Sequence, residues 1–110
     1  MLIKKLPKLE MLPRWLLHGP ASIALHSITI RHCGNFRALP EERLQNLKSL
    51  HTLEIEDCTQ LSALPEGMDG LTALRELKIQ DCPILLKRCK QGIGEDLNKI
   101  AHILSIYFRW

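Results

Sequence analysis

The stretch LKSLHTLEIEDCTQL, at residues 47–61, decides the fold of this chain. Its apolar frame, L-x-x-L-x-x-L-x-I-x-x-C-x-x-L, returns 24 residues later in LTALRELKIQDCPIL, at residues 71–85. Six apolar positions recur with identical internal spacing, and self-similarity at such a period is typical of proteins that stack structural repeats. The sequence therefore predicts a repeat architecture.

The L-x-L-x-x-C core of each copy is typical of the leucine-rich repeat, in which every repeat adds one strand to a horseshoe. The dipeptide Leu-Pro at 39–40 and 64–65 comes after the predicted strands. Proline lacks an amide donor and disfavours helix in the residue before it, so long helices are not expected there. We therefore expect an α/β leucine-rich-repeat solenoid with a parallel β-sheet on the concave face and an irregular or 3₁₀ convex side.

An earlier repeat is visible because Ile30 and Cys33 precede Ile55 and Cys58 by 25 residues. Before it, Leu-Pro at 12–13 resembles the second half of a still earlier repeat. The predicted organisation is a partial leading repeat at 1–21 and three leucine-rich repeats over 22–91, at about 22–46, 47–70 and 71–91.

The period stops at Gly92, and the segment that follows has a different pattern. Helical spacing relates four of its residues, Leu97, Ile100, Ala101 and Leu104. With the apolar residues at 106–110 behind them, they predict that 92–110 forms a C-terminal cap with a short helix.

Strand alternation assigns a face to each residue of the repeated strands. In the strand at 52–56, Leu53 and Ile55 point into the core and the other three residues point to the concave face. Applied to three repeats, the alternation predicts a protein-binding face made of Ser27, Thr29, Arg31, Thr52, Glu54, Glu56, Glu76, Lys78 and Gln80.

Parallel stacking of the repeats also predicts which charged side chains are neighbours on this face. Glu54 is expected beside Lys78, and Arg31 beside Glu56. Opposite charges at such cross-strand positions stabilise a sheet by about 0.2–1 kcal/mol for each pair.

Cys33, Cys58 and Cys82 share one position of the repeat, directly after each strand. Neighbouring strands lie about 4.8 Å apart, so the thiols could meet, but no C-x-x-C pair is present. A row of buried turn thiols is favoured over a metal or redox site, and a reducing compartment is expected. Cys89 lies outside the repeat frame, and its burial is not predicted.

Charge and hydropathy argue against nucleic-acid and membrane functions. The net charge is only +3, and no aromatic residues interleave with the short basic clusters, as a nucleic-acid-binding surface would require. No apolar run approaches the roughly 18 residues of a membrane span, and prolines and charges interrupt the first 19 residues, unlike a secretory signal.

Sites of catalysis are not indicated either. The five histidines show no metal-ligand spacing. The sequence Gly92-x-Gly94 lacks the preceding strand and the following Lys-Ser/Thr of a phosphate-binding loop. We therefore expect no enzyme activity and no catalytic, metal-binding or cofactor-binding residues.

A more specific pattern lies toward the C-terminal end of the chain. It comprises LPEGM at 64–68, LTAL at 71–74, LKIQDCP at 77–83, RC at 88–89, GIGED at 92–96 and KIAHI at 99–103. In these motifs the chain resembles the C-terminal leucine-rich-repeat region of plant coiled-coil-type nucleotide-binding leucine-rich-repeat (NBS-LRR) disease-resistance proteins. The resemblance spans nearly the whole chain. It departs at Leu97, where the family usually has tryptophan, and at Asn98 and Leu104, where the family often has proline.

The resemblance implies a cytoplasmic protein-interaction fragment of an intracellular immune receptor, contributing to pathogen-effector perception and to autoinhibition. Its implied partners are proteins, namely a pathogen effector or guarded host protein and the upstream domains of the same receptor. ADP or ATP would belong to a nucleotide-binding domain that these 110 residues do not include. An alternative is a leucine-rich-repeat substrate adaptor for ubiquitin ligation, which would require an F-box-like helical segment before residue 1.

Overall fold

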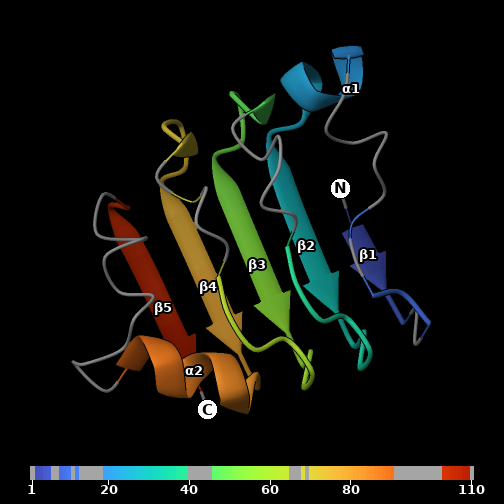
Figure 1. Ribbon diagram of the computed structural model, residues 1–110. Helices are drawn as coiled ribbons and strands as arrows, with labels where there is room; N and C mark the ends of the chain where they lie inside the picture. The colour runs from blue at the N-terminus through green and yellow to red at the C-terminus, as the bar shows by residue number, and fades with distance from the viewer. Residues whose placement is uncertain are drawn as a thin grey trace.

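A computed structural model describes residues 2–5, 8–10, 12, 19–39, 46–64, 68, 70–90 and 103–109. Five parallel strands form a single sheet in the order β1-β2-β3-β4-β5. Figure 1 shows them side by side, in the order of the sequence and pointing in one direction. The strands are β1 (Leu2–Lys4), β2 (Ser27–Arg31), β3 (Thr52–Glu56), β4 (Glu76–Gln80) and β5 (Ser105–Arg109).

The three central strands confirm the repeat prediction in position and in register. Ile30 pairs with Ile55, and Ile55 pairs with Ile79, so equivalent residues of successive repeats lie next to each other. Within each strand the second and fourth residues are buried, while the residues that alternate with them are at least partly exposed. This alternation is what a sheet with one covered face requires.

The helical segments described outside the sheet are short. The helix α1 (Gly19–Ala24) precedes β2, and Asn46, Met68 and Gly70 have 3₁₀ conformation. The longest described helix, α2 (Pro83–Lys90), directly follows the turn after β4. Its first residue is proline, which suits a helix start because the first amide of a helix has no intrahelical acceptor. Among the described residues, no helix is long and apolar enough to cross a bilayer.

The leading segment differs from the prediction of half a repeat, because it also contributes a strand. Ile3 of β1 pairs with Ile30 of β2 and is buried. The spacing from Ile3 to Ile30 is 27 residues, longer than the 24 or 25 of the later repeats. The period of 24 or 25 residues therefore does not indicate β1. The limits of the individual repeats stay predictions.

The C-terminal segment also differs from the prediction, because helical spacing does not continue through Leu104. That residue lies in a bend with 86% of its surface exposed, and β5 begins directly after it. The other residues of the proposed helical pattern, Leu97, Ile100 and Ala101, lie outside the described residues. The last repeat is thus covered at its edge by a fifth strand, which pairs Ile106 with Leu77 and Phe108 with Ile79.

The core lies between the sheet and the convex connections and is almost wholly aliphatic. Side chains from equivalent repeat positions pack in rows, such as Leu53 beside Leu77 and Ile55 beside Ile79. Phe36 is the one aromatic side chain in the buried core of the described residues, and it is 0% exposed. It occupies the position that Leu61 fills one repeat later, so the repeat at about 22–46 carries a larger side chain at this point.

Each of the first four strands is followed directly by one residue with left-handed backbone geometry. Its amide donates a hydrogen bond to the carbonyl of the last residue in the next strand, as His32 does to Glu56 and Asp57 does to Gln80. The sheet thereby gains one further hydrogen bond per repeat before the chain turns. The positive φ angles are 56° at Lys5, 55° at His32, 52° at Asp57 and 53° at Asp81.

Candidate protein-binding face

The nine residues predicted for the concave face do lie together on one face of the sheet. The strand register arranges them in three rows that run across β2, β3 and β4. Eight are half-buried and Glu76 is exposed, so their side chains are accessible without being fully solvated. The rows are Ser27–Thr52–Glu76, Thr29–Glu54–Lys78 and Arg31–Glu56–Gln80.

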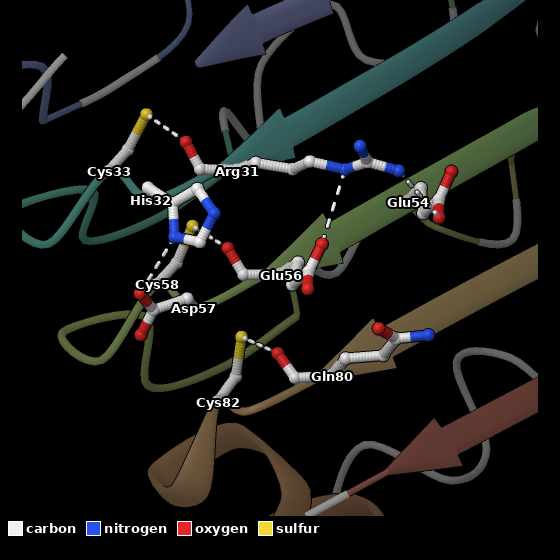
Figure 2. Close-up of polar contacts among 9 residues, drawn as sticks. All are labelled: Arg31, His32, Cys33, Glu54, Glu56, Asp57, Cys58, Gln80 and Cys82. Carbon is white, nitrogen blue, oxygen red and sulfur yellow. Dashed lines mark hydrogen bonds and ion pairs between the residues drawn. The ribbon is translucent and has the colours of Figure 1, made fainter. Parts of the chain in front are cut away.

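Arg31 is the centre of the charge network on this face. Its guanidinium lies 3.2 Å from a carboxylate oxygen of Glu56 and 3.5 Å from one of Glu54. Figure 2 shows the side chain reaching from β2 across to both carboxylates of β3. The predicted Arg31–Glu56 pair is therefore confirmed. Because all three side chains are partly exposed, each contact stabilises the fold by about 1 kcal/mol at most.

The second predicted charge pair, Glu54 and Lys78, is confirmed in its register but not as an ion pair. Glu54 and Lys78 are register partners, as expected. Within the described part of the chain, however, no ion pair joins them, and Glu54 contacts Arg31 instead. The sequence predicted which strand positions are adjacent. It did not predict that Arg31 would contact Glu54 as well as Glu56.

Two further strands widen the face beyond the predicted residues. The register extends the row that begins at Ser27 to Ser105. It extends the row of Thr29 to Leu2 and Tyr107, and the row of Arg31 to Lys4 and Arg109. A signal for β5 was present, since SIYFR at 105–109 contains a β-branched residue and two aromatic residues, types that are enriched in strands. The helical spacing of the residues just before it masks this signal.

The three repeat cysteines form the predicted row of buried turn thiols. Cys33, Cys58 and Cys82 are all 0% exposed and unpaired. Each thiol donates a hydrogen bond to the carbonyl two residues earlier, at sulfur-to-oxygen distances of 3.4, 3.5 and 3.3 Å (Figure 2). Hydrogen bonding with the neighbouring Cys82, together with burial, raises the pKa of the Cys58 thiol above its ordinary value. Each thiol therefore ties its turn to the end of the preceding strand through a hydrogen bond to the backbone. The side chain of Cys89 lies outside the described residues.

Polar contacts along the turns add to this row. The Nδ1–H of His32 donates to a carboxylate oxygen of Asp57 at 2.9 Å, so consecutive left-handed turns are joined by side chains as well as by the backbone. In the part of the chain that the structure describes, no three histidine, cysteine or acidic side chains gather in a way that could hold a metal ion.

The buried thiols should resist alkylation until the chain unfolds. We expect iodoacetamide to modify Cys33, Cys58 and Cys82 at least about a hundredfold more slowly in the native chain than in urea, because exposure requires opening of the core. Peptide mapping by mass spectrometry measures each site separately, so modification of Cys89 does not obscure the result. Equal rates in native and unfolded chains would contradict the buried row.

Comparisons with known proteins give relatives of one kind, although no protein-family model matches the sequence. Disease resistance protein RPP8 of Arabidopsis thaliana is 38% identical over 63 residues, which are 57% of this chain and 7% of the relative. Putative disease resistance protein RGA4 of Solanum bulbocastanum is 45% identical over 52 residues, 47% of this chain and 5% of the relative. Probable disease resistance protein RF45 of Arabidopsis thaliana is 41% identical over 59 residues, which are 54% of this chain and 6% of the relative.

The matched segments make up only a small part of these much longer relatives, between 5% and 7% of their length. The similarity therefore concerns a short segment and not the whole of any relative. Taken with the parallel repeat sheet, it shows a leucine-rich-repeat chain related to plant disease-resistance proteins, consistent with a segment of a nucleotide-binding leucine-rich-repeat resistance protein.

Proposed function

We propose that the concave face binds proteins in plant defence, where it contributes to perception of a pathogen effector and to autoinhibition of the receptor. The partners would be an effector or a guarded host protein and the upstream domains of the same receptor. The observation that carries the proposal is the continuous face of three register-matched rows of mostly polar residues, one crossing β2 to β5 and two crossing all five strands. The names of the relatives supply the defence context.

The physical support comes from how a repeat sheet presents its residues. Parallel strands in register hold neighbouring side chains about 4.8 Å apart, so a partner meets a rigid array rather than a set of mobile loops. Arg31, Glu54 and Glu56 are already held in place by their mutual contacts. Side chains that are ordered before binding lose less entropy when a partner docks.

The proposed role is non-catalytic and needs no cofactor in this segment. Any ADP or ATP would be held by a nucleotide-binding domain elsewhere in the receptor. We place the receptor in the cytoplasm, and free buried thiols at three repeat positions agree with a reducing compartment.

Reversing the charges of the face should abolish partner binding while the fold survives. The triple variant Arg31→Glu, Glu54→Lys and Lys78→Glu exchanges charges at partly exposed positions and leaves the buried rows untouched. In the full-length receptor, we expect at least about a tenfold loss of affinity for the upstream domains or the effector, because charges at an interface act in both attraction and specificity. Co-precipitation and defence-induced cell death in leaf tissue measure the two proposed activities.

Lys48→Glu provides the matched control, since it makes the same net charge change of −2 in an exposed turn outside the sheet. It should leave both readouts unchanged. If the triple variant remained folded by circular dichroism and kept wild-type binding to both kinds of partner, the concave-face assignment would be wrong.

A further inference from the structure

We infer that the concave residues of β4 and β5 bind a carboxylate-rich segment of a partner protein. This inference rests on the proposed function, since it names the chemistry of the partner for one part of the same face. The part concerned, which we call the basic end, comprises Lys78, Tyr107 and Arg109.

The charges of β2 and β3 are largely satisfied within the sheet. One guanidinium, that of Arg31, lies within 3.5 Å of two carboxylates, those of Glu54 and Glu56. Contacts with Arg31 hold Glu54 toward β2, although its register partner on the other side is Lys78. The network therefore leaves the ammonium group of Lys78 without an ion-pair partner among the described residues.

The register brings Lys78 close to two side chains of β5. Tyr107 is its direct partner across the strands, and Arg109 is one position further along the same face, beside Gln80. Diagonal neighbours of this kind lie about 7–8 Å apart. Across this distance, the long side chains of Lys78 and Arg109 can both reach one carboxylate. Tyr107 is 47% exposed, so its ring offers apolar contact area beside the two charges.

The surrounding charges favour an acidic peptide over a nucleic acid. Glu54, Glu56 and Glu76 lie in neighbouring positions of the same rows and would repel a continuous phosphate backbone. A nucleic-acid groove also needs several cations with interleaved aromatic residues. The basic end has two cations and one aromatic ring, which suits a short carboxylate-rich peptide.

The test is a titration of the whole 110-residue chain with an end-blocked hexaglutamate peptide, followed by amide chemical shifts in NMR spectra. Hexaglutamine and a single-stranded oligothymidylate of similar length serve as comparison ligands. We expect the largest shifts at Lys78, Tyr107 and Arg109, and weaker binding when the ionic strength rises from about 0.02 M to about 0.3 M.

Lys78→Gln and Arg109→Gln should each weaken hexaglutamate binding roughly twofold to fivefold, the range expected for one partly exposed charge contact. Lys4→Gln is the matched control, because it removes the same charge from the same face at β1. It should weaken binding by less than about twofold, through long-range attraction alone. The amide spectrum of each variant verifies its fold, and the two separate substitutions on β4 and β5 provide independent tests.

Equal weakening by Lys4→Gln and Lys78→Gln would overturn the assignment, as would shifts located away from β4 and β5. Tighter binding of the oligothymidylate than of hexaglutamate would assign the basic end to nucleic acid instead. The proposed function would remain standing in each of these cases if the charge-reversed triple variant still lost its protein partners, so the two failures can be told apart.

Discussion

Replacing Phe36 with alanine is expected to lower the free energy of unfolding by about 3–5 kcal/mol. The side chain is 0% exposed and is the one aromatic group in the described core. Its neighbours are aliphatic side chains held by the repeat register, so they cannot close the space that the ring leaves. The cost therefore includes a cavity as well as the lost burial of apolar surface.

Urea unfolding followed by circular dichroism measures this difference. Arg37→Ala is the matched control, because Arg37 is the next residue, is exposed, and pairs with Glu10 only at the surface, at 3.4 Å. It should change stability by less than about 1 kcal/mol. A Phe36→Ala variant as stable as Arg37→Ala would show that the core at this position is not packed as described.

Replacing Glu54 with proline is expected to cost at least about 3 kcal/mol, although the side chain lies on the solvent side of the sheet. Glu54 sits in the middle of β3, which pairs with β2 and β4. Proline removes an amide donor from the hydrogen-bonded ladder and holds φ near −65°, away from strand geometry. The loss comes from the backbone and does not depend on the hydrophobic core.

Glu54→Ala separates the two causes. It removes the contact with Arg31 and keeps the amide, so it should cost less than about 1 kcal/mol. The difference between the two variants in urea unfolding gives the backbone contribution. If both were equally stable, β3 would not lie in the interior of the sheet.

The central part of the fold could be predicted because its signals repeat. Leu53 and Leu77 occupy the same place in two copies of one frame, and each copy supports the interpretation of the other. Pairing of Ile30, Ile55 and Ile79 followed from the same alignment, and the structure confirms it. A periodic core of this kind needs no knowledge of distant contacts, since each repeat packs mainly against its neighbours.

The ends of the sheet were missed for the opposite reason. β1 has only three residues and stands 27 positions before its partner strand, and β5 follows a stretch with helical spacing. Each is an edge strand that pairs with a single neighbour, and its place depends on that neighbour's register. Leu2, Lys4, Ser105, Tyr107 and Arg109 were therefore absent from the predicted face.

The sequence alone determined the repeat, the direction of alternate side chains and the nine central residues of the concave face. These features depend on local periodicity, which is present in every repeat. Only the tertiary structure decided that Arg31 takes both Glu54 and Glu56 and that Lys78 faces Tyr107 across the last strands. These contacts depend on the reach of flexible side chains and on the pairing of edge strands in three dimensions. Neither can be predicted from the spacing of residues in the sequence.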